Sequence, residues 1–175
     1  MNILIIRGYD SSFSMKETIE IYGKAVNITM EPIGKPVNLR KKFKNILSKY
    51  HLADYDQIYL VSMSSCMTSI IDKKYFDRVC LITPFYLYTK PVCKLLKAAP
   101  KDFFGCHILI LLNGRMGTFD KRIRLKLAEL DNITDNKYFM KHFENIEVIK
   151  GVDHYLGEMG VLDIVKSDIS KQISN

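Results

Sequence analysis

The sequence predicts an α/β domain with three layers, in which helices cover both faces of a six-stranded, mostly parallel sheet. Two observations predict this class. Short runs rich in Ile, Leu and Val, such as 2–6 and 57–61, are typical of strands buried on both faces of a parallel sheet. Stretches with helical spacing separate the runs, which indicates right-handed βαβ units. At 175 residues and 47% hydrophobic content, the chain is expected to form a single domain, 1–175.

The expected elements follow from apolar periodicity and from the Gly, Pro and Ser residues that interrupt it. Strands are expected at residues 2–6, 25–30, 57–61, 77–84, 106–112 and 145–149. Helices are expected at residues 15–22, 39–50, 68–71, 91–98, 120–130, 137–143 and 161–173. Chemistry in such sheets lies at the carboxyl ends of the strands. The candidate loops therefore begin at Arg7, Ser62, Pro84, Asn113 and Lys150.

Charge and cysteine content narrow the classes of partner and cofactor. The formal net charge is +7, but the basic run 40–44 is interpreted as a solvated helix face, so nucleic acid is not an expected partner. No apolar run reaches the roughly 20 residues of a membrane span, and we expect a cytoplasmic protein. The cysteines show no metal-ligand spacing and are expected to be unpaired thiols, with no metal and no other cofactor; they are Cys66, Cys80, Cys93 and Cys106.

The stretch 57–71 reads as a strand, a sharp turn and a helix. Its turn, 62–66, has the pattern small-x-Ser-x-small, which suits a serine nucleophile on a strained turn and singles out Ser64. Glycine usually occupies both small positions, whereas this chain has Ser62 and Cys66. The alternative is that these serines only cap the following helix.

Acidic residues and a histidine follow later strands. His154 lies after the last expected strand, and Asp120 is the expected acid, with Asp131 and Glu158 as poorer substitutes. The chain order of Ser64, acid and His154 supplies the nucleophile, orienting group and base that acyl transfer needs. Taken singly, His154 could equally be a loop histidine held by local hydrogen bonds, and Asp120 could be a helix N-cap.

These residues resemble those of the α/β-hydrolase superfamily along nearly the whole chain. The form is minimal and without a cap, similar to the small YqiA/YcfP-type esterase-like proteins. The similar segments are 5–12, with a Gly-aromatic-x-Ser opening, 61–66 at the nucleophile turn, and 151–155, with a Gly-x-x-His-aromatic close. The chain departs from the family at Arg7, where His is usual, and at Gly117, where the acid is expected.

The resemblance implies a serine hydrolase of the carboxylesterase or thioesterase type that acts on a small acyl ester through Ser64, His154 and Asp120. It also implies an oxyanion hole formed by the backbone N–H groups of Tyr9 and Ser65. An open mouth is expected, lined by Tyr9, Phe85, Tyr86 and Tyr88. The alternative is a catalytically impaired or dead hydrolase fold that binds a protein partner. Nucleotide binding at 7–12 is weaker, because the loop lacks the phosphate-binding glycine patterns.

Overall fold

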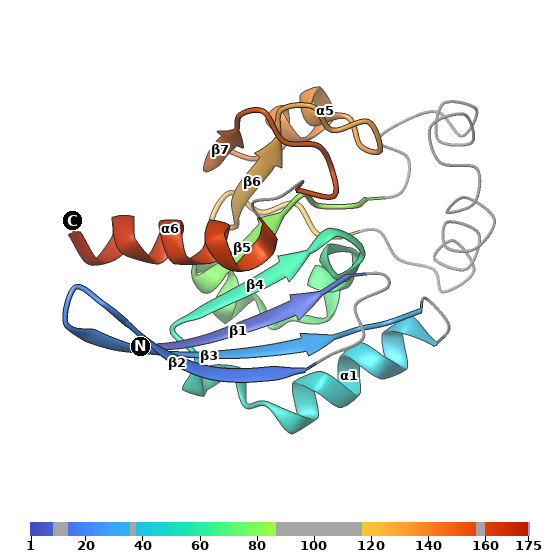
Figure 1. The fold of residues 1–175 in the computed structure, drawn as a ribbon. Helices are drawn as coiled ribbons and strands as arrows, with labels where there is room; N and C mark the ends of the chain where they lie inside the picture. Colours follow the sequence, from blue (N-terminus) through green and yellow to red (C-terminus); the bar gives the residue numbers. More distant parts are fainter. Residues whose placement is uncertain (9–13, 36–37, 87–116, 157–159, 175) are drawn as a thin grey trace.

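A computed structural model describes residues 1–8, 14–35, 38–86, 117–156 and 160–174. Within these residues, seven strands form one mixed sheet in the order β2-β3-β1-β4-β5-β6-β7 (Figure 1). The strands are β1 (Asn2–Arg7), β2 (Met15–Ile21), β3 (Lys24–Pro32), β4 (Gln57–Val61), β5 (Val79–Ile82), β6 (Arg124–Ala128) and β7 (Ile146–Ile149). Only β2 pairs in antiparallel fashion, with β3, and all other neighbours are parallel. The fold is therefore α/β with a mostly parallel sheet.

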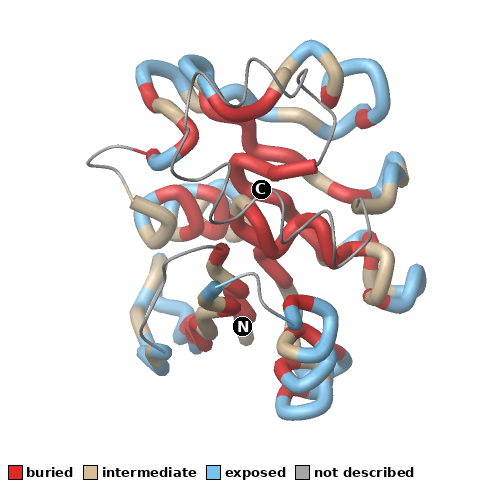
Figure 2. The backbone as a smooth tube through the Cα atoms, turned by 90° about the vertical axis from the view of Figure 1, so that its right-hand side faces the viewer, coloured by how far each residue is buried: buried red, intermediate tan, exposed pale blue. Residues whose placement is uncertain are grey.

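The described helices are α1 (Leu39–Lys49), α5 (Asn136–Met140), α6 (Gly160–Ser174) and the 3₁₀ helices Leu52–Asp54, Ser62–Ile70 and Lys73–Arg78. None of them is long and apolar enough to cross a membrane. Buried residues concentrate in the sheet and in the helix surfaces turned to it (Figure 2). Successive residues of β1 belong to two different hydrophobic clusters. Leu4 and Ile6 are in the cluster that includes residues of α1, whereas Ile3 and Ile5 are in the cluster that includes residues of α6.

Five expected strands are confirmed as β1, β3, β4, β5 and β7, and the expected helices near 39–50, 137–143 and 161–173 are confirmed as α1, α5 and α6. The helix expected at 68–71 falls within the 3₁₀ helix Ser62–Ile70. The strand expected at 106–112 and the helix expected at 91–98 lie outside the described residues. Because β2 and β6 were not expected, the predicted number of six strands is wrong.

The prediction of a helix at 15–22 is wrong, because these residues form β2. Ile19 and Ile21 alternate with polar residues, which is the period of a strand. Tyr22 and Gly23 follow with φ of 48° and 72°, and two successive positive φ angles form the tight turn that joins antiparallel strands.

The prediction of a helix at 120–130 is also wrong, because this stretch contains β6. Ile123, Leu125 and Leu127 are buried in the cluster of α1, whereas Lys126 and Ala128 alternate with them. Pairing with both β5 and β7 places β6 inside the sheet. The next loop therefore begins at Glu129, and this changes which acid is available to the site.

Candidate active site

The turn after β4 presents Ser62 at the carboxyl edge of the sheet. Ser62 directly follows the last strand residue, Val61, and has a φ of 50°. A non-glycine residue seldom adopts a positive φ, and such backbone conformations are concentrated at functional turns. The Ser62 Oγ lies 2.8 Å from the His154 Nε2. The turn therefore directs the Ser62 hydroxyl to an imidazole nitrogen.

The other ring nitrogen of His154 contacts Asp131. The His154 Nδ1 lies 2.9 Å from the Asp131 Oδ2, and both side chains are buried. Asp131 lies in the loop after β6 and His154 in the loop after β7. The two loops are joined directly, because the Leu130 N–H donates to the Val152 carbonyl oxygen at 2.9 Å. The carboxyl ends of β4, β6 and β7 thus bring together a serine, an aspartate and a histidine.

The surroundings of Asp131 favour its ionised form. Burial alone would raise the pKa of this carboxyl, but hydrogen bonds from His154 and Thr134 outweigh burial, and the pKa is lowered. The backbone N–H groups of Ile133 and Thr134 donate to Oδ1, and the Thr134 hydroxyl donates to Oδ2, each at 2.8 Å. A carboxylate only accepts hydrogen bonds, so the His154 Nδ1 carries the proton. The Nε2 lone pair is then free to accept the Ser62 proton.

Ser64 was the expected nucleophile, but the structure places Ser62 against His154 instead. The Ser64 side chain is fully buried, and its Oγ donates to the carbonyl oxygens of Ile6, at 2.7 Å, and Val61, at 3.0 Å. Its single hydroxyl proton is therefore shared between main-chain acceptors. Ser64 ties the turn after β4 to the end of β1.

Gly8, at the end of β1, packs directly against the turn that carries Ser62. A Cβ at Gly8 would lie 2.8 Å from the Val61 oxygen, 3.0 Å from the Met63 nitrogen and 3.1 Å from the Ser62 Cβ. Real Cβ atoms do not approach a backbone oxygen so closely. Glycine is therefore required at position 8 for this arrangement of the turn.

Asp120 was the expected acid, but the structure assigns it a different partner. Its carboxylate accepts from the backbone nitrogen, Nε and Nη2 of Arg122, and these hydrogen bonds lower its pKa to about 2. Gly117, which occupies the position expected for the acid, packs against the ring of Tyr86, where a Cβ would overlap the ring. Asp131 follows the last residue of β6, Ala128, by three positions and is the acid that reaches His154.

The residues expected to form the oxyanion hole and the mouth have different roles or lie outside the described part. Tyr9 and Tyr88 lie outside it. Ser65 donates through Oγ to the Ser62 carbonyl oxygen at 2.6 Å. Phe85 and Tyr86 are buried in the core, and the Tyr86 ring packs edge-on against neighbouring aromatic rings, those of Phe119, Phe139 and Phe143. Phe85 and Tyr86 therefore stabilise the core and do not line an open mouth.

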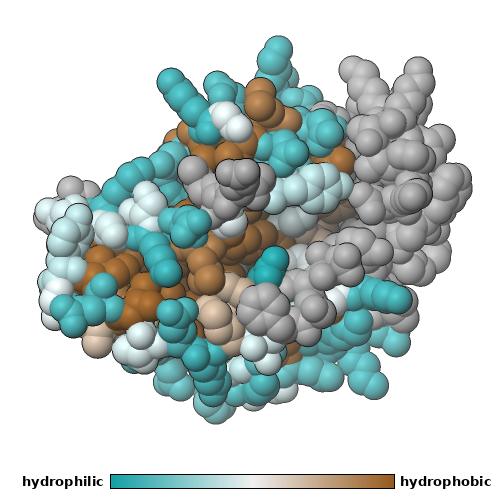
Figure 3. Space-filling view, in the orientation of Figure 1, coloured by the Kyte–Doolittle hydropathy of each residue, from teal (hydrophilic) through white to brown (hydrophobic). Residues whose placement is uncertain are grey.

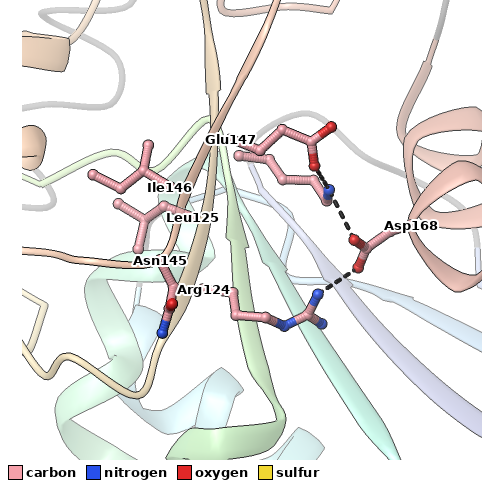
Figure 4. A pocket seen from close by; sticks show the side chains of 7 residues that line it. Arg124, Leu125, Asn145, Ile146, Glu147 and Asp168 are labelled. Atoms are coloured by element: carbon pink, nitrogen blue, oxygen red, sulfur yellow. Dashed lines mark hydrogen bonds and ion pairs between the residues drawn. The ribbon is translucent and has the colours of Figure 1, made fainter. Parts of the chain in front are cut away.

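A cavity of about 200 Å³ lies at the opposite, amino ends of β6 and β7, away from the three site residues (Figure 4). Its wall contains an ionic network centred on Asp168 of α6. Asp168 accepts from Arg124 and Lys126, each at 2.8 Å, and Lys126 also pairs with Glu147. Tyr59 donates to Asp168 at 2.6 Å. The charged groups satisfy one another, and the network fastens α6 to the sheet.

Within the described residues, no group of three or more His, Cys, Asp or Glu side chains could hold a metal ion. Cys66 and Cys80 are buried thiols, while Cys93 and Cys106 lie outside those residues. A scan against protein-family models and a search of curated proteins gave no match to the chain. Function is therefore inferred from the geometry of the site.

Proposed function

We propose that this protein is a serine hydrolase of the carboxylesterase or thioesterase type, which acts on a small acyl ester through Ser62, His154 and Asp131. The observation that carries the proposal is the continuous contact from the Ser62 Oγ to His154, at 2.8 Å, and from His154 to Asp131, at 2.9 Å. The chain order of nucleophile, acid and histidine is that of α/β-hydrolases. We therefore extend the proposal to a minimal α/β-hydrolase fold with helices on both sheet faces.

The chemistry follows from the protonation state of the site. The Ser62 Oγ attacks the acyl carbonyl carbon while the His154 Nε2 takes the hydroxyl proton, and Asp131 stabilises the resulting imidazolium. When the tetrahedral intermediate collapses, the carbon–oxygen or carbon–sulfur bond to the leaving group breaks, and His154 returns the proton to that group. His154 then deprotonates a water molecule, which attacks the acyl ester of Ser62. The carboxylic acid is released and the Ser62 hydroxyl is restored.

The nucleophile position also changes the expected oxyanion donor. In acyl-transferring α/β-hydrolases one donor is the backbone N–H of the residue after the nucleophile, which is Met63 here and not Ser65. The Met63 nitrogen lies beside Gly8, at the end of the strand from which the second donor would come. One such donor contributes on the order of 10²–10³ in rate.

A catalytically dead fold used for binding is the alternative outcome. The sequence suggested it because Gly117 occupies the expected acid position and because Ser62 and Cys66 replace the usual glycines of the turn. The first reason is weaker now, because Asp131 supplies a carboxylate to His154 from another position. No described contact favours a binding role over hydrolysis.

The test is labelling with a fluorophosphonate probe together with hydrolysis of p-nitrophenyl acetate. We expect wild-type protein to be labelled and to hydrolyse the ester, and Ser62→Ala to lose both activities. Ser64→Ala is the matched control, because it removes a neighbouring hydroxyl that bonds only to main-chain carbonyls. This control should keep its labelling. Folded wild-type protein that is inert to both reagents would support the binding role, and loss of labelling in Ser64→Ala alone would restore the original assignment.

A further inference from the structure

β2 forms one edge of the sheet and leaves one side of its backbone without a neighbouring strand in the described part of the chain. It pairs with β3 without interruption from Met15 to Ile21, so no bulge twists the edge away. The strand contains no proline, and four of its seven residues are exposed. Long, regular edges of this kind are templates for pairing with another chain.

The two faces of β2 differ in chemistry. Met15, Ile19 and Ile21 pack against the cluster that includes α6 and remain partly exposed. Figure 3 shows apolar side chains gathered below α6 and over the β2–β3 hairpin. The alternate residues, Lys16 and Glu20, are exposed and carry opposite charges on the other face. The first face also carries the exposed Glu17, so any partner strand must match three apolar residues and one glutamate on that face and a Lys/Glu pair on the other.

A second copy of β2 satisfies both requirements when it runs antiparallel and is centred on Thr18. In this register Lys16 lies opposite Glu20 of the second copy, and the two-fold axis repeats the pair. On the other face Met15 lies opposite Ile21 of the second copy and Glu17 lies opposite Ile19. The two Thr18 side chains meet at the axis. Opposite-charge, apolar and Thr–Thr pairs are each favourable between antiparallel strands.

The neighbouring registers are poorer. Antiparallel pairs must lie on the same face, so the register can shift only by whole pleats. Centring on Glu17 places two glutamates opposite each other at the axis. Centring on Ile19 places Lys16 opposite Tyr22 and separates it from Glu20. Only the Thr18 register combines two ion pairs with no like-charge contact.

We propose that the protein forms a two-fold symmetric homodimer through antiparallel pairing of β2 with β2 of a second copy, in the register centred on Thr18. The interface is isologous, since one strand supplies both halves of each contact. It continues the sheet across the axis and covers the partly exposed row of Met15, Ile19 and Ile21. The proposal does not depend on hydrolase activity, because β2 contributes none of the three site residues.

The test exploits the symmetry of the charge pairs. Lys16→Glu places two glutamates opposite each other at both pairs, and Glu20→Lys places two lysines there. Each single variant should weaken self-association at least about tenfold, because two favourable pairs become repulsive. Mixing the two single variants should restore it, since every cross-strand pair in the mixed dimer then joins opposite charges. The double variant Lys16→Glu/Glu20→Lys should also dimerise.

The measurement is sedimentation equilibrium across a concentration series, with wild-type protein expected at twice the chain mass. Lys150→Glu, after β7 at the opposite edge of the sheet, is the charge-matched control and should dimerise normally. Lys16 also lies 6.0 Å from the centroid of the Tyr50 ring, so a thermal melt must accompany its variant. Restoration by mixing shows that both variants are folded. A monomeric wild-type protein would overturn the proposal. So would a dimer whose dissociation constant is the same in wild type and in every charge-reversal variant.

Discussion

Replacing Asp131 by asparagine is the most informative perturbation of the site, because it changes one atom in a buried carboxylate with four hydrogen-bond donors. The retained oxygen can still accept the backbone N–H groups of Ile133 and Thr134. At the other position, an amide NH₂ would face the His154 Nδ1–H, and two donors cannot bond. The imidazole then moves its proton from Nδ1 to Nε2, where it faces the Ser62 hydroxyl.

In this tautomer Nε2 cannot take the Ser62 proton. We therefore expect Asp131→Asn to lower kcat by on the order of 10⁴, the loss found when a triad acid is replaced in this way. Binding contacts are unchanged, so KM should change much less than kcat. The turn that holds Asp131 keeps both backbone bonds to Oδ1, and the folded protein should persist.

The assay is p-nitrophenyl acetate hydrolysis under burst and steady-state conditions, with the fluorophosphonate labelling rate as an independent measure. Asp120→Asn is the matched control, since Asp120 is a partly exposed partner of Arg122 with no contact to His154, and its replacement should leave the rate within about twofold. The reasoning is refuted if Asp131→Asn keeps more than about a tenth of the wild-type kcat, or if Asp120→Asn loses as much activity as Asp131→Asn.

Three further predictions concern packing, pH and thiols. Gly8→Ala should reduce the labelling rate of Ser62 by tenfold or more, because its Cβ would lie 2.8 Å from the Val61 oxygen and displace the turn. The pKa of the Asp168 carboxyl is lowered, since its ion pairs outweigh the opposing effect of burial. The Asp168 carboxylate therefore contributes its full stabilisation above the pKa of about 3.9 that it has in the unfolded chain. This stabilisation is lost as pH falls through the lower pKa of the folded protein. Urea unfolding at pH 7 and pH 3 should detect the loss. Asp168→Ala should lower the free energy of unfolding at pH 7 by about 3–5 kcal/mol in the same assay, because it leaves buried cations unpaired. A variant as stable as wild type would contradict the stabilising role of the ionic network. Cys66 and Cys80 are buried, so neither should react with a thiol reagent until the protein is denatured, and rapid reaction of either in native protein would contradict this placement.

The sequence predicted strands well where apolar residues were continuous and poorly where they alternated. In the stretch 120–130, which contains β6, the spacing of Ile123, Leu127 and Leu130 is that of a helix, whereas Leu125 between Ile123 and Leu127 gives the spacing of a strand. When a stretch fits both periods, its secondary structure depends on the elements that surround it. Here pairing with β5 and β7 favours the strand. The 15–22 stretch contains the same ambiguity.

The errors at the site follow from these ambiguities. The acid was expected near Gly117, and because the 120–130 stretch was assigned to a helix, Asp131 beyond it was given only as a poorer substitute. The serine that contacts His154 lies two positions before the expected Ser64, because Ser62, Ser64 and Ser65 are all small and no glycine marks the centre of the turn. The available signal was the end of the buried run at Val61, since the residue directly after the strand occupies the strained position. His154 was singled out because only one histidine follows the last strand, and it contacts Ser62 and Asp131.

The absence of glycines around the nucleophile has a physical explanation in the neighbouring strand. A nucleophile turn needs close backbone approach, and glycine is the usual means because it has no Cβ to intrude. Here the close approach comes from Gly8, directly after β1, which packs against Val61, Ser62 and Met63. Ser64 replaces a flanking glycine and uses its hydroxyl to bond the Ile6 carbonyl oxygen on the same strand. On the other side, the Phe85 N–H donates to the Ser62 carbonyl oxygen at 3.2 Å. The turn is therefore held from both neighbouring strands, and its strained conformation at Ser62 does not require glycine at its flanks.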